Sequence, residues 1–239
     1  MRKAVVVGAT SGIGRAVAHA LSANGYVVGI TGRRSHLLDE LVNKLPSTAY
    51  SAVMDVTRPS EARSCFYALA ERMSGVDLVV LSAGVGHTDE AASWKHVHET
   101  VETNAVGFAA LADAAYRHFE ARGQGHLVGI TSVAAVRESG GAPAYHASKA
   151  FAARYLAGLR HRASKTDLQL TVTDVRPGFV DTAMAKGEGL FWVASPERAA
   201  SQIIAAIEDS RMTVYVTRRW RLVATFLALI PGWLYRRVV

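Results

Sequence analysis

Residues 4–16, AVVVGATSGIGRA, join a short apolar run to a turn that contains three glycines. An apolar run that enters a Gly-rich turn and then a helix-forming stretch is typical of a buried strand in a parallel sheet. Gly8, Gly12 and Gly14 allow a tight turn and let the backbone approach a pyrophosphate at a helix N-terminus. Their G-x-x-x-G-x-G spacing differs from the G-x-G-x-x-G fingerprint, so an ordinary strand-to-helix turn is the alternative interpretation.

The rest of the chain repeats this alternation of apolar runs and helical stretches. Helical periodicity is clear in residues 15–24 and 197–208, and similar stretches separate most of the apolar runs. The pattern predicts a Rossmann-like, doubly wound α/β fold, in which helices cover both faces of a seven-stranded parallel sheet. The seven apolar runs are residues 4–9, 26–32, 49–56, 77–84, 126–132, 168–175 and 213–217.

Length, charge and cysteine content limit the class of protein. The chain has 239 residues, half of them hydrophobic, and a single cysteine, Cys65, so no internal disulfide can form. The first residues run directly into the first apolar run and contain no signal peptide, and we expect a cytoplasmic protein. The net charge is +7, but residues 211–239 hold six Arg and no acid, while the body is close to neutral. We therefore expect no nucleic-acid interface.

The end of the second apolar run points to the type of dinucleotide. NAD-dependent enzymes place an acid near this position to bind the ribose hydroxyls. Arg33 and Arg34 stand there instead, and a guanidinium can bind a 2′-phosphate through paired hydrogen bonds. We predict NADP(H), with Arg33 as the main contact; the alternative is a pair of solvated surface arginines.

Two further segments lie where such a cofactor would pass. Asp55 follows the third apolar run and has two possible roles: it accepts a hydrogen bond from the adenine amino group, or it caps the next helix. Ser82, Ala83 and Gly84 end the fourth run, at the expected reversal of strand order, where small residues leave room for a ligand.

The stretch APAYHASKAF, residues 142–151, places Tyr145 and Lys149 one helical turn apart. A tyrosine beside a lysine is commonly a packed ring over a solvated ammonium, but here it can also be a proton donor with its activator. Ser132 ends the fifth apolar run, on the side of the sheet where ligands bind. Asn104 lies within a helical stretch, where asparagine is mildly unfavourable, so we expect another reason for it.

Taken together, these residues resemble the short-chain dehydrogenase/reductase family, from about residue 4 to about residue 216. The resemblance implies a sheet of order 3-2-1-4-5-6-7 and a catalytic tetrad of Asn104, Ser132, Tyr145 and Lys149. It also implies cofactor contacts along the Gly-rich turn, the strand ends and the Pro177-Gly178 segment. These contacts are Gly8, Thr10, Ser11, Gly12, Ile13, Gly14, Arg33, Arg34, Asp55, Val56, Ser82, Ala83, Gly84, Tyr145, Lys149, Pro177, Gly178, Val180 and Thr182. Two positions depart from the family pattern, with Val7 in place of Thr and Ser82 in place of Asn.

The implied chemistry is hydride transfer between a nicotinamide and a carbonyl or alcohol. Lys149 and a cationic nicotinamide would lower the pKa of Tyr145 from about 10 so that it exchanges a proton with the substrate oxygen. Ser132 would bind that oxygen, Lys149 would also bind the nicotinamide ribose, and Asn104 would anchor a water on the proton path. We expect an NADPH-dependent reductase of a ketone or aldehyde. The alternatives are an alcohol dehydrogenase working in the oxidising direction and a non-catalytic NADP-binding sensor or scaffold.

The histidines do not suggest a metal site. His96 and His98 are two apart, which is poor spacing for one helical face, with His87 nearby. A metal site would require a third ligand and usually a carboxylate or thiolate partner. We expect no metal.

The last segment, residues 218–239, is an apolar tail that follows the expected catalytic domain of residues 1–217. Its uncharged run from Leu222 to Tyr235 is too short to cross a bilayer, is broken by Pro231 and is flanked by arginines. The tail is expected either to lie on a membrane surface, on the inner membrane face, or to pack over the substrate pocket or another subunit. A membrane position would favour a lipid-like or otherwise hydrophobic substrate. From the family resemblance we expect a homodimer or homotetramer.

Overall fold

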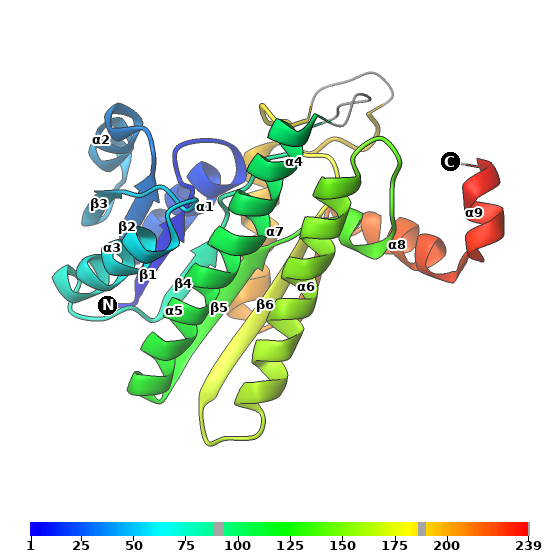
Figure 1. The fold of residues 1–239 in the computed structure, drawn as a ribbon. Coiled ribbons are helices and arrows are strands. Elements are labelled where there is room, and N and C mark those ends of the chain that lie inside the picture. The colour runs from blue at the N-terminus through cyan, green and yellow to red at the C-terminus, as the bar shows by residue number, and fades with distance from the viewer. Residues whose placement is uncertain (88–92, 186–189, 239) are drawn as a thin grey trace.

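The computed structural model describes residues 1–87, 93–185 and 190–238. In this part of the chain, seven parallel strands form one sheet of order β3-β2-β1-β4-β5-β6-β7, which confirms the predicted topology (Figure 1). The strands are β1 Lys3–Val7, β2 Val27–Gly32, β3 Ala49–Val53, β4 Leu78–Leu81, β5 Gln124–Ile130, β6 Gln169–Pro177 and β7 Thr213–Val216.

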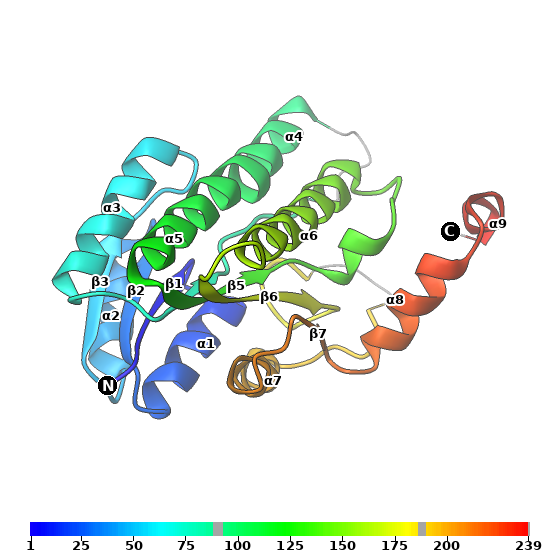
Figure 2. The same cartoon turned by 90° about the horizontal axis from the view of Figure 1, so that it is seen from below.

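Helices cover both faces of the sheet (Figure 2). One face carries α1 Gly12–Ala23, α2 Ser35–Lys44 and α7 Pro196–Glu208, and the other carries α3 Pro59–Arg72, α5 Phe108–Arg122 and α6 Pro143–Ala163. Because successive strand residues point to opposite faces, Ala4 and Val6 pack into the first layer, whereas Val5 and Val7 pack into the second. The run of residues 4–7 in β1 is therefore apolar at every position.

The chain reverses its direction of winding next to β1. Strands β2 and β3 lie on one side of β1, and β4 lies on the other. Ligands of open α/β sheets bind outside the carboxyl ends of the strands at such a reversal. The helical segment after β4 consists of α4 Trp94–Val101, a π-helical turn at Glu102–Gly107, and α5.

The tail forms two helices, α8 Trp220–Leu229 and α9 Gly232–Val238, which extend from the β7 side of the sheet past a short 3₁₀ helix at Val133–Val136 (Figures 1 and 2). Ile230 separates them in an extended conformation with ψ 128, because the residue before a proline disfavours the helical region. This confirms the predicted break at Pro231. Across the described ranges, no helix combines the length and apolar character required to cross a bilayer.

Candidate active site

A cavity of about 920 Å³ lies at the carboxyl ends of the strands. Its walls include almost all the residues predicted for the site, drawn from the ends of six strands and from α6. They are Gly8, Thr10, Ser11, Gly12, Ile13, Arg33, Arg34, Asp55, Val56, Ser82, Ala83, Gly84, Ser132, Tyr145, Lys149, Pro177, Gly178, Val180 and Thr182. Gly14 and Asn104 do not line the cavity, and each acts on it through neighbours.

The Gly-rich turn at residues 8–14 leaves a concave space that larger side chains would fill. Gly8 has φ +83, and a Cβ there would lie 2.6 Å from the backbone nitrogen of Ala83. A Cβ on Gly14 would lie 2.2 Å from the carbonyl oxygen of Gly8, so Gly14 allows α1 to approach the turn. Ser11 begins α1 without capping it through its side chain, which leaves the first N–H groups of α1 open to an anion. These features fit the pyrophosphate of a dinucleotide.

The end of β2 is basic. Arg34 donates hydrogen bonds to Thr10 Oγ1 at 2.7 Å and to Ser11 Oγ at 3.1 Å, which holds its guanidinium against the Gly-rich turn. Arg33 is exposed and lines the same end of the cavity. No carboxylate follows Gly32 directly, so the position that would select the ribose hydroxyls of NAD is cationic.

Asp55 does not cap the following helix, so that alternative is wrong. Its Oδ1 accepts from the backbone N–H of Thr57 at 3.0 Å and from Thr57 Oγ1 at 2.8 Å. Helix α3 begins only at Pro59, with Arg58 as its N-cap. Partial burial raises the pKa of Asp55, but the two Thr57 hydrogen bonds and the charges of Arg33 and Arg58 together outweigh it. The pKa therefore lies below its ordinary value, and the carboxylate is charged at neutral pH.

Lys149 is buried on α6, one turn after Tyr145. Its Nζ donates to the carbonyl oxygen of Ile130 at 3.1 Å and lies 5.7 Å from the centroid of the Tyr145 ring. Burial lowers the pKa of Lys149 to about 8, and the negative charge of Asp174 partly opposes this effect. The ammonium is therefore still the main form at neutral pH, although its preference for a proton is weak.

The predicted fall in the pKa of Tyr145 is not found in the chain alone. Burial raises the pKa of Tyr145, and a hydrogen bond with Ser132 lowers it by less than burial raises it. Lys149 does not contribute, because its ammonium is directed to Ile130 and lies beside the ring rather than on the hydroxyl. Tyr145 is therefore a protonated phenol at neutral pH.

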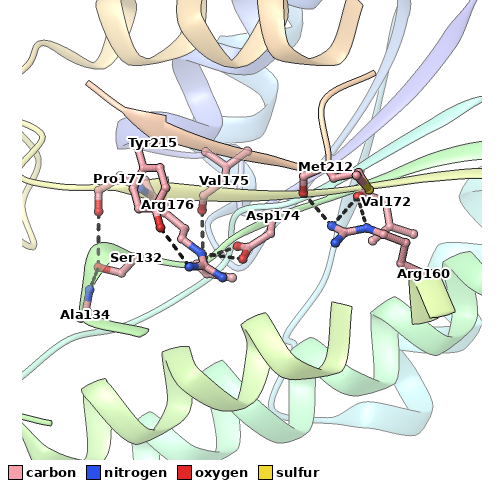
Figure 3. Close-up of polar contacts among 11 residues, drawn as sticks. Ser132, Ala134, Arg160, Val172, Asp174, Val175, Arg176, Pro177, Met212 and Tyr215 are labelled. Carbon is pink, nitrogen blue, oxygen red and sulfur yellow. Dashed lines mark hydrogen bonds and ion pairs between the residues drawn. The ribbon is translucent and has the colours of Figure 1, made fainter. Parts of the chain in front are cut away.

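Ser132 joins the end of β5 to the short 3₁₀ helix (Figure 3). Its Oγ accepts from the backbone N–H of Ala134 at 3.1 Å and donates to the carbonyl oxygen of Pro177 at 3.4 Å. These bonds hold the hydroxyl at the carboxyl edge of the sheet, where it also forms a hydrogen bond with the side chain of Tyr145. Ser132 and Tyr145 thus form one hydroxyl pair at the cavity wall.

Asn104 lies in the π-helical turn between α4 and α5, and its amide contacts the protein rather than the cavity. Its Nδ2 donates to Val85 O at 2.7 Å and to Ser148 Oγ at 3.1 Å, and its Oδ1 accepts from Val85 N at 2.9 Å. A Cβ on Gly84 would lie 3.3 Å from Asn104 Oδ1 and 3.4 Å from Lys149 Nζ, so the glycine permits this close approach. Asn104 is thus a positioning residue for the loop after β4 and for α6.

The prediction from sequence missed Asp174, a buried carboxylate on β6 (Figure 3). Asp174 pairs with Arg176 at 2.7 Å and accepts a short hydrogen bond from Thr131 Oγ1 at 2.5 Å. It also acts on Lys149 through its charge. A charged residue inside an apolar run is rare in a buried strand, and that signal was available in the sequence.

The other end of the cavity is closed by the tail. Trp220, Leu227 and Tyr235 line it together with Arg137. Arg137 Nε donates to the carbonyl oxygen of Leu227 at 2.7 Å, its guanidinium lies 5.1 Å from the Tyr235 ring centroid, and a second nitrogen donates to Ile230 O. The tail thus packs over this end of the cavity, which is one of the two arrangements expected.

Gly178 leaves room for the ring of Trp220, the first residue of α8. A Cβ on Gly178 would lie 2.0 Å from the ring of Trp220, so no larger residue fits there. Trp220 is buried against Phe179 and Phe191, at ring-centroid distances of 5.3 and 5.0 Å. Among the described residues, no group of three His, Cys, Asp or Glu side chains is close enough to hold a metal ion.

Comparison with known proteins agrees with this architecture. A sequence profile described as short chain dehydrogenase matches residues 2–190. An uncharacterized oxidoreductase of Myxococcus xanthus is 37% identical over 188 residues, which cover 77% of this chain and 74% of the relative. An NADP-dependent 3-hydroxy acid dehydrogenase of Shigella flexneri is 31% identical over 182 residues, 74% of this chain and 71% of the relative.

A solved structure gives the same result. A short-chain dehydrogenase from Streptomyces avermitilis superposes with a TM-score of 0.80 at 25% identity, covering 95% of this chain and 92% of the other. The profile match spans the sheet through β6, including the turn of Gly8 to Gly14, Ser132, and the pair of Tyr145 and Lys149. The chain belongs to the short-chain dehydrogenase family of oxidoreductases.

Proposed function

We propose that this oxidoreductase uses NADPH to reduce an apolar ketone or aldehyde to an alcohol. One observation carries the proposal: a single cavity has Arg33 and Arg34 at one end and the group of Ser132, Tyr145 and Lys149 at the other. The basic end suits a 2′-phosphate, and the hydroxyl pair suits a carbonyl oxygen.

The cofactor would be held by groups that the fold leaves open. The N-terminus of α1 and the turn at Gly8 would bind the pyrophosphate, and Arg33 and Arg34 would bind the 2′-phosphate. When bound, NADPH supplies the hydride for the carbonyl carbon. The Shigella relative is named as NADP-dependent, which supports the same preference here.

The burial of Tyr145 supports the reductive direction. A reductase needs a protonated donor for the developing alkoxide, and burial raises the pKa of Tyr145 in the chain. Ser132 would donate to the same oxygen, and its hydrogen bond, which lowers the pKa of Tyr145, would favour the phenolate left after proton transfer; Lys149 would hold the nicotinamide ribose. Oxidation would require the phenolate first, which burial disfavours.

The walls beyond Tyr145 support an apolar substrate. Phe179, Met184 and Leu190 line this end together with the tail residues. Arg137 also lines this end, but its guanidinium already donates to tail carbonyls and lies over Tyr235. A carboxylate of a substrate would compete with these bonds, whereas an apolar group would not.

The deciding experiment is a titration of the purified chain with NADPH and NADH, followed by the quench of intrinsic fluorescence. We expect NADPH to bind more tightly, and Arg33→Ala to weaken it by about tenfold or more through loss of charged hydrogen bonds. Arg117→Ala, on the outer face of α5, is the matched control and leaves both affinities unchanged. Equal binding of both nucleotides in the parent would contradict the assignment of Arg33.

Turnover separates the remaining alternatives. A screen of apolar ketones with NADPH should give a rate that Tyr145→Phe lowers by about a hundredfold or more, while NADPH binding persists. NADPH binding without measurable turnover of any substrate would favour a sensor or scaffold. Oxidation of alcohols without measurable reduction would favour the dehydrogenase direction.

A further inference from the structure

Helix α8 has two apolar faces, of which the protein uses one. Trp220, Ala224 and Leu227 recur at helical spacing and face the body of the domain. Trp220 and Ala224 pack with Val133 in a small cluster of their own. This inward face accounts for the attachment of the tail to the domain.

The opposite face is apolar and fully open to solvent. Leu222, Phe226 and Leu229 follow each other at i, i+4 and i+7, so they lie on one stripe of the helix. Their exposed fractions are 73%, 67% and 76%, and Trp233 on α9 is 61% exposed. Single exposed apolar residues are common, but three on one stripe of a short helix, with a fourth on the next helix, mark a candidate interaction surface.

The surroundings of this outer face are strongly basic. Arg218, Arg219 and Arg221 precede it and are exposed, and Arg237 follows it. Residues 211–239 contain no acidic residue at all. In the ranges that the structure describes, no carboxylate lies within ion-pair distance of these four arginines, although Arg219 also lies over the Trp192 ring at 5.9 Å.

We propose that the outer face of α8 and α9 docks on an anionic lipid surface. An interfacial helix combines a large apolar side chain stripe with arginines that contact anionic headgroups, and both are present here. The helices are too short to span the bilayer, so they lie in the plane of the interface. This proposal concerns where the protein works and does not depend on the direction of its reaction.

Charge argues against a second copy of the chain as the occupant. A two-fold interface brings the same patch of both molecules together. Such a contact here would face arginines with arginines and would supply no acid from either tail. Like charges across an interface are unfavourable, whereas anionic headgroups neutralise the same arginines.

The test is flotation of the full-length protein with vesicles of phosphatidylcholine alone or mixed with phosphatidylglycerol. We expect binding to the mixed vesicles, and we expect added salt to weaken it because the arginines contribute through screened charge. Phe226→Ser should weaken binding by about tenfold or more, since a buried apolar side chain is lost. Arg218→Ala should weaken it by about fivefold.

Matched controls come from exposed residues away from the tail. Met212→Ser removes a side chain that is 62% exposed, and Arg154→Ala removes an exposed arginine on α6; neither should change vesicle binding. Absence of binding to mixed vesicles would overturn the proposal. So would binding that Phe226→Ser leaves intact, or a dimer in sedimentation that this variant converts to monomer. NADPH titration of the same samples keeps this result separate from the proposed activity.

Discussion

The side chain of Asn104 and the backbone of Val85 exchange two hydrogen bonds, at 2.7 and 2.9 Å. This pair ties the loop after β4 to the π-helical turn, and a third bond to Ser148 extends the link to the helix that carries Lys149. π-Turns inside helices are often found at functional sites. Three segments that are distant in sequence thus meet at a single amide.

Replacement of Asn104 by alanine should loosen all three segments. The backbone groups of Val85 lose their partners, and an unsatisfied buried group costs about 1–3 kcal/mol. We expect a lower free energy of unfolding in urea and a lower kcat. Ser148→Ala, which removes only one of the three bonds, is the control and should have a smaller effect. Equal stability of the Asn104→Ala protein and the parent would contradict the assigned role.

Lys149 predicts a specific dependence of stability on pH. Its pKa is about 8 in the folded chain and 10.5 as a free side chain, so between these values the unfolded chain binds more protons. The free energy of unfolding therefore rises with pH in this window, by up to about 3 kcal/mol from this group. Lys149→Met should remove the rise, as measured by urea unfolding across the window. An unchanged slope in the variant would contradict the burial of the ammonium as the cause.

The charge of Asp174 should affect the pKa of Lys149. Its charge raises the pKa of Lys149 against the effect of burial, so Asp174→Asn should lower that pKa further. The rise of stability with pH should then begin at lower pH than in the parent. Thr131→Val removes a hydrogen bond to Asp174 but keeps the charge, so it should leave the midpoint unchanged. A shift in both variants would indicate a general change of packing.

Arg137 should hold the tail over the cavity. Arg137→Ala removes its bonds to the carbonyls of Leu227 and Ile230 and its contact with Tyr235. We expect faster amide hydrogen exchange in residues 220–238 and a higher KM for an apolar substrate, with cofactor affinity unchanged. Arg137→Lys keeps the charge but loses the planar fork, and should fall between the two. Unchanged exchange in Arg137→Ala would show that the packing of Trp220 and the hydrogen bond from the Tyr235 hydroxyl to Glu138 O suffice to anchor the tail.

The sheet and the cavity could be predicted because their signals are local. Each signal lies within a few residues of the chain. These signals are the apolar run before Gly8, the arginines after β2, and the one-turn spacing of Tyr145 and Lys149. The remaining features depend on partners distant in the chain. Nothing near Asn104 indicates that its amide meets Val85, and nothing near Lys149 indicates that its ammonium is directed to Ile130.

The tail shows even more clearly that the sequence alone does not identify contacts with distant partners. Residues 220–229 are apolar on two opposite faces, so helical periodicity alone does not say which face turns inward. The choice is made by Gly178 and Phe179, which are about forty residues away and accept the ring of Trp220. The structure therefore resolves part of the alternative left open by the sequence: one face packs over the cavity.

The close contact between Gly178 and the ring of Trp220 has an evolutionary consequence. Part of the cavity wall comes from a terminal segment that adds no strand to the sheet, and its attachment depends on the absence of a side chain at position 178. Recombination that exchanges the tail would then remodel this end of the cavity while Ser132, Tyr145 and Lys149 stay in place. A mutation that enlarges Gly178 would instead displace Trp220 in one step and open this end of the cavity.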